Sequence, residues 1–540
     1  MTGHAGTRSG RSPVITPLHF AANSVGVMDR SVRQTAGPRL THRHLSPSRA
    51  ACSLSRSTPK PRDTDGDERR EDAWDARGWP RGLRTLAPVI PDPARQADLT
   101  PPAWRAVAVM LLAVGAALGA RIARMPARRV AAASAVIGLA TVALVHAGTR
   151  RAQSAACSAT PPATPAPSAP PAALPRITVV IAARDEIQAL PALIRDLGRQ
   201  DHRELDGSPA FDVVVVDDRS TDGSGTAARR AADEAGLSEV TTVVRRQADA
   251  QPDGKGAALA VVPDEMVRGA AVLVLDADAR LGPDVVRRAA TLVADGCQAF
   301  TARRRVAGHV WSAVVQDDEQ TVDTFIQRAR GALGGCPEFR GNGMVVTTAR
   351  LRAIGGWRAG ALTEDLDLST RLAIAGTRVV LADDLEVWEA PTATVSAFAR
   401  QRLRWAEGSV RRFLDLLPAA IASAELVPAA KADLAVSIAQ LTLPTVLLGA
   451  VADGMLRRSP GSGLAIAGAY VGTAWLVTAM ALRDAALREA GAPPPIMRAA
   501  VAAVFLLHWA VATPAALACV ALRPGPVRFA RTRDRRLPPT

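Results

Sequence analysis

The sequence is poor in aromatic residues and in cysteine. Phenylalanine, tryptophan and tyrosine make up 4% of its 540 residues, and there is a single tyrosine. The five cysteines are scattered, and no two have the spacing of a zinc knuckle or of a CxxC redox pair. These absences exclude a disulfide scaffold, and unpaired thiols fit a reducing compartment. No internal repeat and no signal peptide is evident, which excludes fibrous proteins and gives no indication of secretion.

Positive charge exceeds negative charge: 66 Lys and Arg stand against 51 Asp and Glu, which leaves a net charge of +15. Such a balance raises the hypothesis of nucleic-acid binding. The excess, however, lies in residues 1–100, in the tail after residue 523 and beside apolar stretches, without a zinc finger, helix-turn-helix or aromatic RNA-binding motif. Arginine beside apolar stretches is typical of contact with anionic lipid headgroups. We therefore expect a membrane bilayer as a partner, and no nucleic acid.

Five apolar stretches are candidates for membrane helices: 104–120, 130–147, 434–452, 462–482 and 499–522. The first two are near the lower length limit for a spanning helix, so a pair of buried Ala-rich helices is their alternative interpretation. The composition then predicts six parts: a disordered basic region (1–100), two membrane helices (101–150), a Pro/Ala-rich linker (151–176), a central α/β domain (177–417), a membrane region with three helices (418–522) and a basic tail (523–540).

The charge pattern leaves the number of spans open. The arginines between residues 121 and 129 and the basic tail both favour the cytoplasmic side of a membrane. Both cannot lie there if all five stretches span and the central domain is cytoplasmic. One stretch, 104–120 or the region 414–430, is therefore a candidate for an interfacial position. We expect a multi-pass protein of the cell membrane whose central domain faces the cytoplasm.

The central domain alternates short Val/Ile runs with helical Ala/Arg/Leu stretches. The runs 177–183, 211–218, 240–246 and 270–278 are almost continuously apolar. Such strands are buried on both faces, as in a parallel sheet covered by helices. The pattern predicts an α/β fold with a mostly parallel, Rossmann-like sheet, flanked by the membrane helices.

Acidic residues follow three of these runs, and Asp185 and Glu186 are those after the first. In an open parallel sheet, ligands bind at the carboxyl ends of the strands. Asp218 ends the second run, where the alternative is a turn with a helix cap, because Ser220 and Asp222 are good capping residues. Asp276 and Asp278 end the fourth run. Two carboxylates at this spacing can hold Mg²⁺, and the phosphates of a substrate then complete the coordination shell of the ion.

Two further motifs lie closer to the C-terminus. Thr363-Glu364-Asp365 follows a Gly-rich segment, and Gln401, Arg404 and Trp405 share one face of an expected helix. The planar fork of an arginine suits a diphosphate, and a tryptophan offers a face to a sugar or an acyl chain. An amphipathic helix at the membrane surface is the alternative interpretation of the last motif.

Together these motifs, D, DxD, TED and QxxRW, resemble those of the membrane-bound family 2 glycosyltransferases. The resemblance covers residues 176–413 and makes 177–417 the catalytic domain. It implies a sheet of the glycosyltransferase A type, a UDP-sugar donor, a lipid or glycan acceptor, Mg²⁺ or Mn²⁺ as cofactor, and inversion at the anomeric carbon. Two residues depart from the family pattern: Arg219 stands where a small residue is usual, and Asp185 where asparagine is commoner.

The resemblance also implies roles for single residues. Asp365 is the expected general base, and Asp278 with Asp276 the expected metal ligands. The expected donor-binding residues are Ala183, Glu186, Asp218, Lys255, Asp276, Gln401 and Arg404. The expected acceptor-binding residues are Gly341, Asn342, Glu364 and Trp405.

The nature of the acceptor is the remaining question. A secreting polysaccharide synthase needs a sugar channel lined with aromatic side chains, and the three C-terminal stretches contain few. The run Arg404-Trp405-Ala406-Glu407-Gly408 also resembles bacterial monoglucosyldiacylglycerol synthases. We therefore expect transfer of one hexose, from UDP-glucose, to a lipid such as diacylglycerol. A processive polysaccharide synthase of the cellulose or poly-N-acetylglucosamine type is the first alternative, and a non-catalytic scaffold that binds a nucleotide sugar is the second.

Overall fold

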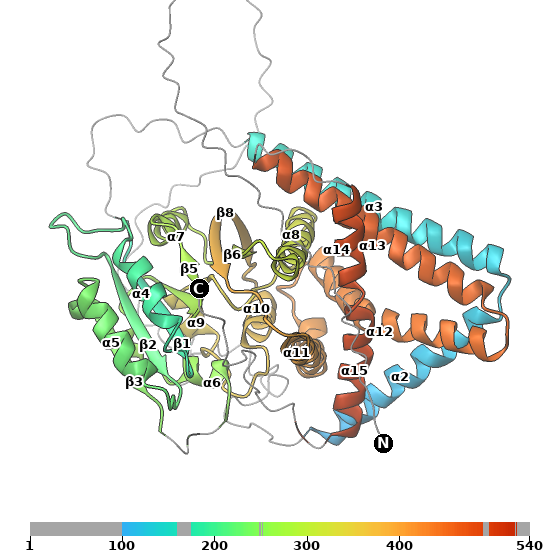
Figure 1. Cartoon of the computed structure of the whole chain (residues 1–540), viewed down its shortest axis with the longest axis horizontal. Coiled ribbons are helices and arrows are strands. Elements are labelled where there is room, and N and C mark those ends of the chain that lie inside the picture. The colour runs from blue at the N-terminus through green and yellow to red at the C-terminus, as the bar shows by residue number, and fades with distance from the viewer. Residues whose placement is uncertain are drawn as a thin grey trace, which may run out of the picture. The chain divides into compact units, whose positions relative to one another are not determined.

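A computed structural model describes residues 100–158, 174–247, 250, 252–489, 496–523 and 525. Most of the predicted disordered region, residues 159–173 of the predicted linker and most of the predicted tail lie outside these residues. The described part consists of an eight-stranded sheet covered by helices, and of a group of long apolar helices (Figure 1).

The sheet has the strand order β3-β2-β1-β4-β7-β6-β8-β5. Its first four strands are parallel, β7 is antiparallel to both β4 and β6, β6 and β8 are parallel, and β5 is antiparallel to β8. The strands are β1 (Ile177–Ala183), β2 (Phe211–Asp217), β3 (Thr241–Arg245), β4 (Ala271–Asp276), β5 (Arg280–Leu281), β6 (Ala299–Val306), β7 (Met344–Thr347) and β8 (Val380–Glu389). The mostly parallel α/β fold predicted from the sequence is confirmed.

Helices cover both faces of this sheet, as its continuous apolar strands require. Successive residues of a strand point to opposite faces. Val179 accordingly packs in a cluster with Leu193, whereas its neighbour Val180 packs in another with Leu368. The first cluster includes α4 (Leu190–Gly198), α5 (Ser224–Glu234) and α7 (Val285–Ala294), and the second α6 (Lys255–Ala260), α9 (Thr348–Ala353) and α10 (Glu364–Ile374).

Two helices, α8 (Trp311–Ala332) and α11 (Val395–Ala422), lie between the sheet and the apolar helices (Figure 1). Helix α8 packs against two apolar helices, α3 (Ala127–Ser158) and α13 (Gly461–Arg488), and α11 packs against α15 (Trp509–Leu522). A Cβ at position 148 of α3 would lie 2.8 Å from the carbonyl oxygen of Ala329 in α8, so Gly148 permits these two helices to pack closely.

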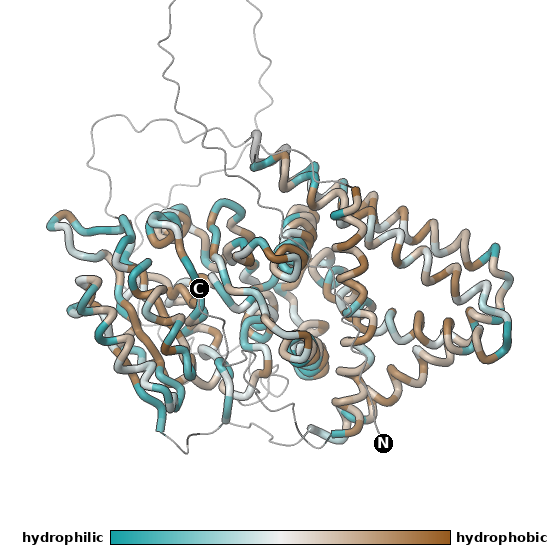
Figure 2. Tube along the Cα trace, viewed as in Figure 1, coloured by the Kyte–Doolittle hydropathy of each residue, from teal (hydrophilic) through white to brown (hydrophobic). Residues whose placement is uncertain are grey.

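In the part of the chain that the structure describes, five helical segments are long and apolar enough to cross a membrane: Pro102–Ala123 (α2), Ala127–Ala152 (within α3), Pro428–Leu456 (α12), Gly461–Arg488 (α13) and Ile496–Leu522. The last one is broken at residues 507–508 into α14 (Ile496–Leu506) and α15. In Figure 2 the trace of these helices consists mostly of hydrophobic residues, whereas the trace of the sheet domain alternates between hydrophobic and hydrophilic residues. These helices match the five predicted stretches, and α3 continues to Ser158, into the segment for which the sequence predicted an extended linker.

The first four of these helices form two pairs, α2 with α12 and α3 with α13. The pairs converge at the α2–α3 and α12–α13 loops and diverge towards α8 (Figure 1). The loops meet where Ser462 Oγ donates to the carbonyl of Met125 at 2.6 Å and Arg124 lies 3.8 Å from Asp453. The arginines between 121 and 129 therefore lie at the end of the helices away from the sheet domain.

Candidate active site and the cavity behind it

The carboxyl ends of β1, β2 and β4 lie side by side. In the sheet register Ala183 is opposite Asp217, and Ala182 is opposite both Val216 and Asp276. The loops that follow β1 and β2 are joined by hydrogen bonds from the N–H groups of residues 185–187 to Ser220 Oγ, Ser224 Oγ and Asp222 Oδ2. This edge of the sheet is therefore a fixed rim rather than a pair of independent turns.

Both residues that depart from the family pattern have left-handed backbone in this rim. The φ angle is 54° at Asp185 and 61° at Arg219. Asparagine and aspartate tolerate this region better than most residues, which accounts for an acidic residue at 185. The Asp185 carboxylate accepts hydrogen bonds from the N–H and Oγ1 of Thr221, at 2.7 and 3.0 Å. Arg219 is held by its ion pairs with Asp218 and Asp253.

Asp218, predicted to bind the base or ribose of the donor, is already engaged by two arginines. Its Oδ1 accepts from Arg219 Nε at 2.9 Å and from Arg246 Nη1 at 2.6 Å. The Asp218 N–H donates to the carbonyl of Ala183 at 2.8 Å. Asp218 therefore lines the cavity described below with its carboxylate already paired to Arg219 and Arg246, two contacts that the motif pattern did not predict.

Lys255 connects the DxD motif to the TED motif. Its Nζ donates to Asp276 Oδ1 at 2.6 Å and to the carbonyl of Gly341, and it lies 3.6 Å from Glu364 Oε1. Asn342 is fully buried, and its Oδ1 accepts from the N–H of Asp276 at 3.1 Å. Asn342 does not line the cavity described below, so its position differs from the acceptor contact that the sequence predicted: it supports Asp276 from behind.

The TED carboxylates lie at the N-terminus of α10. Burial raises the pKa of Glu364 to about 7, assisted by the negative charge of Asp365 and opposed by the Lys255 ammonium group. Burial also raises the pKa of Asp365. Both carboxyls have raised pKa values, and because they are adjacent and interact, their titration belongs to the pair. A group that titrates near neutral pH suits general-base chemistry.

Helix α11 brings the QxxRW motif against these carboxylates. A Cβ at Gly408 would lie 2.3 Å from Thr363 Cγ2, so this glycine permits the close packing of α11 against the start of α10. Arg404 interacts electrostatically with Glu364 and Asp365. Gln401 Oε1 accepts from Thr392 Oγ1 at 3.1 Å. The predicted helical face therefore points to the site rather than to a membrane surface.

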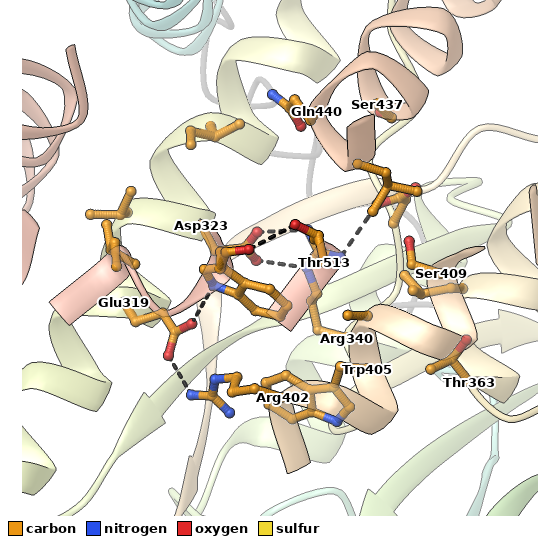
Figure 3. Close-up of a pocket in the computed structure, with 18 of the residues that line it drawn as sticks. Glu319, Asp323, Arg340, Thr363, Arg402, Trp405, Ser409, Ser437, Gln440 and Thr513 are labelled. Carbon is orange, nitrogen blue, oxygen red and sulfur yellow. Dashed lines mark hydrogen bonds and ion pairs between the residues drawn. The ribbon is translucent and has the colours of Figure 1, made fainter. Parts of the chain in front are cut away.

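An arginine inside the motif, Arg402, was not singled out from the sequence. It is buried and forms an ion pair with Glu319 of α8, and its guanidinium lies 4.3 Å from the ring centroids of both Phe398 and Trp405. The other oxygen of Glu319 accepts from Trp509 Nε1, at 3.0 Å. Burial is the largest single influence and raises the pKa of Glu319, but the charges and hydrogen bonds of Arg402 and His508 together outweigh it and lower this pKa to about 2. This cluster connects the motif tryptophan to the last apolar helix (Figure 3).

One cavity of about 2290 Å³ contains nearly all of the predicted site residues. Its volume is more than twice the upper end of about 1,000 Å³ for ordinary ligand pockets. It extends from the strand-end rim, past α8 and α11, into the space between the diverging helix pairs. The predicted residues that line it are Ala183, Glu186, Asp218, Lys255, Asp276, Asp278, Gly341, Glu364, Asp365, Gln401, Arg404 and Trp405.

The carboxylates of Asp276 and Asp278 fit a hard divalent cation that the substrate helps to coordinate. Both line the cavity, and Mg²⁺ typically binds one or two carboxylates together with substrate phosphates. One oxygen of Asp276 is engaged by Lys255. Within the described ranges, no group of three or more His, Cys, Asp or Glu side chains could hold a metal by itself. The donor set therefore suits a metal bound with a diphosphate.

Comparisons with known proteins address the family directly. A family model described as "Glycosyltransferase like family 2" matches residues 175–408, which include all eight strands and the QxxRW motif. A beta-monoglucosyldiacylglycerol synthase from Synechocystis sp. is 28% identical over 368 residues, which are 66% of this chain and 74% of that protein. One from Nostoc sp. is 31% identical over 246 residues, 45% of this chain. The chain covers only 50% of that second relative.

A solved structure shares the fold. The mannosyltransferase PcManGT from Pyrobaculum calidifontis, in complex with GDP-Man and Mn²⁺, aligns with a TM-score of 0.50 and 22% identity over 72% of this chain and 98% of that one. The match in sheet architecture agrees with the family match and with the order of the motifs. Residues 175–408 therefore match a family 2 glycosyltransferase domain, which confirms the resemblance drawn from the motifs and supports the prediction of a glycosyltransferase.

Proposed function

We propose that the protein transfers a hexose, from UDP-glucose, to the free hydroxyl of diacylglycerol in a membrane. The observation that carries the proposal is the cavity: it contains the donor-site residues at one end and aliphatic walls between the apolar helices at the other. A water-soluble donor and a lipid acceptor can therefore meet in one space. The similarity to beta-monoglucosyldiacylglycerol synthases supports the same acceptor.

The donor end offers cations for a diphosphate. Lys255 and Arg404 both line it, and an arginine can donate two parallel hydrogen bonds to a phosphate group. Mg²⁺ or Mn²⁺ held by Asp278 and Asp276 would stabilise the negative charge on the leaving diphosphate. The Mn²⁺ in the PcManGT complex supports a divalent cation here.

Asp365 is the proposed general base. Its carboxylate takes the proton of the acceptor hydroxyl as that oxygen bonds to the anomeric carbon of the sugar. The bond from this carbon to the diphosphate oxygen breaks on the opposite side, and the nucleoside diphosphate leaves with the bonding electrons. An α-linked donor then gives a β-linked product, in agreement with the names of the relatives. The protonated Asp365 passes its proton to solvent.

The cavity walls favour a lipid over a growing polysaccharide. Where the cavity runs between the helix pairs, its walls are mostly aliphatic, and Tyr470 is the one aromatic residue that α2, α3, α12 and α13 contribute within the described chain. Sugar channels need aromatic stacking surfaces, and acyl chains need aliphatic ones.

The cytoplasm, where nucleotide sugars and free thiols are found, is the proposed side of the catalytic domain, whose Cys297 and Cys336 are unpaired.

The test is transfer of labelled sugar by the full chain in detergent–lipid micelles with Mn²⁺. UDP-glucose, UDP-galactose and GDP-mannose are offered separately over dioleoylglycerol. We expect label from UDP-glucose in one chloroform-soluble product, lost in Asp365→Asn. Label in an insoluble polymer would replace the proposal with a polysaccharide synthase, and label from GDP-mannose alone would overturn the donor.

A further inference from the structure

The face of α12 that lines the cavity changes in polarity along its length. Asp433, Ser437 and Gln440 all line the cavity, and their spacing of i, i+4 and i+7 places them on one helix face. Pro444 and Leu447 continue the same face and also line the cavity. The face thus passes from a charge to a hydroxyl, then to an amide, then to hydrocarbon.

The hydrogen bonds of these side chains differ. The Asp433 carboxylate accepts from Arg330 Nε and Nη2 and from the N–H of Cys336, at distances between 2.8 and 3.1 Å. Ser437 Oγ donates to the carbonyl of Asp433 at 3.0 Å. The carboxamide of Gln440 forms no hydrogen bond with any other described residue, and it is exposed within the cavity (Figure 3).

A glutamine without a partner inside an apolar helix is unfavourable in a bilayer, because no water is present there to bind its amide. Polar residues in such positions are usually functional. Gln440 lies seven residues from Asp433, which is roughly 10 Å along the helix at 1.5 Å per residue. It therefore lies between the charged residue Asp433 and the hydrocarbon part of the face, which begins at Pro444.

We propose that this face of α12 is the binding site of the acceptor lipid, with Gln440 Nε2 donating to an ester carbonyl of diacylglycerol. The acyl chains extend beyond Pro444 into the space between the diverging helix pairs, and the free hydroxyl points towards Asp365. This inference rests on the proposed function and adds to it the residue that recognises the ester.

The charged residues around this site favour a neutral lipid. Arg330 is paired with Asp433 and Glu338, and the other arginines of this part of the cavity are paired too: Arg340 with Asp323, Arg402 with Glu319 and Arg412 with Glu338. A lipid phosphate would have to displace one of these buried or partly buried carboxylates, and breaking a buried pair is strongly unfavourable. Diacylglycerol carries no charge and leaves all of them intact.

The experiment compares an ester lipid with an ether lipid. Dioleoylglycerol has two ester carbonyls, whereas dioleylglycerol ether has the same chains and hydroxyl without them. We expect the wild-type chain to show a three- to tenfold higher kcat/KM for the ester, corresponding to about one hydrogen bond. Gln440→Met, of similar shape without the donor, should lower this ratio to about one, through KM and not kcat. Leu448→Met, on the same helix outside the cavity lining, should keep the wild-type ratio.

The outcomes separate the inference from the function on which it rests. A Gln440→Met variant that keeps the wild-type ester preference overturns the inference while transfer to diacylglycerol stands. A higher kcat/KM for phosphatidic acid or a polyprenyl phosphate in the wild type overturns the neutral-lipid site. A wild-type chain that transfers sugar to no lipid overturns the proposed function, and the inference with it.

A second variant tests the acyl site without touching a polar group. Ala469 of α13 lines the cavity, and Ala469→Phe places a ring in the space assigned to the acyl chains. We expect kcat/KM for dioleoylglycerol to fall at least fivefold and that for dihexanoylglycerol to change less than twofold. An equal fall for both lipids, at unchanged donor hydrolysis, would contradict the assignment.

Discussion

The two ends of the cavity are built on different physical principles. At the donor end, strand-end loops are joined by hydrogen bonds, and Lys255 connects two motifs through Asp276 and Glu364. At the membrane end, α2 packs against α12 through glycines, and the walls are aliphatic. Polar chemistry requires particular residue types at particular spacings, whereas apolar packing accepts many sequences. Only the first end therefore carries motifs that can be recognised from a sequence.

Loss of the general base is expected to have the largest effect. In Asp365→Asn the carboxylate that takes the acceptor proton is gone, and we expect turnover to fall about 10²- to 10⁴-fold. Binding of the donor, measured by titration calorimetry with UDP-glucose, should remain. Asp384→Asn, an exposed residue, serves as the control. Unchanged lipid glycosylation in Asp365→Asn would contradict the role of Asp365 as general base. If the protein were a scaffold that binds the donor without turnover, the wild type itself would show no lipid glycosylation.

Substitutions in the ion pair of Glu319 and Arg402, which lies between the two ends of the cavity, are expected to have the next largest effect, on the stability of the protein. Glu319→Ala leaves Arg402 buried without its ion-pair partner, and we expect a loss of about 3–5 kcal/mol in stability. The double variant Glu319→Ala/Arg402→Met should recover a large part of this loss, because no unpaired charge remains. Unfolding of the protein in detergent, followed by intrinsic fluorescence, measures both. Equal losses in the single and double variants would show that packing, not charge, decides stability here.

A substitution confined to the membrane end tests whether close packing of α2 against α12 stabilises that end of the protein. A Cβ at Gly119 of α2 would lie 2.3 Å from the carbonyl oxygen of Val446 in α12. We therefore expect Gly119→Ala to destabilise the protein by about 1–3 kcal/mol. Gly468→Ala in α13 meets nothing within 4 Å and should be neutral or slightly stabilising. The thermal midpoints of the two variants decide the matter, and equal midpoints would refute the close packing.

The smallest expected effect is a pH dependence confined to the donor end. Glu364 titrates near pH 7 and the pKa of its neighbour Asp365 is also raised, so the pair gains a proton as the pH falls, and a protonated Asp365 cannot accept one from the substrate. Turnover should therefore fall as the pH is lowered through the range in which the pair takes up this proton. Glu364 in the native protein keeps a proton that the unfolded chain loses above pH 4.5, so its contribution to stability declines as the pH rises from 4.5 to about 7. A flat profile of kcat between pH 5.5 and 8 would contradict the raised pKa values.

Much of the donor end could be predicted because its signals are local. Asp276 and Asp278 follow an apolar run, and such a run ends at the ligand-binding edge of a parallel sheet. By contrast, the ion pair of Glu319 with Arg402 joins residues 83 positions apart, so no local sequence pattern predicts it. The four strands that follow β4 were not predicted. Arg280–Leu281 and Met344–Thr347 are too short to show periodicity, and charged residues interrupt the apolar pattern of Ala299–Val306 and Val380–Glu389.

The sequence by itself determined the fold class, the order of the motifs, the family and the five apolar helices, because each depends on residue type and near neighbours. Only the tertiary structure decided three other matters. It joined the donor site to the space between the helix pairs, placed the 121–129 arginines away from the sheet domain, and aligned Asp433, Ser437 and Gln440 along one wall of the cavity. A helical face can be read from spacing, but the space it borders is created by elements hundreds of residues apart.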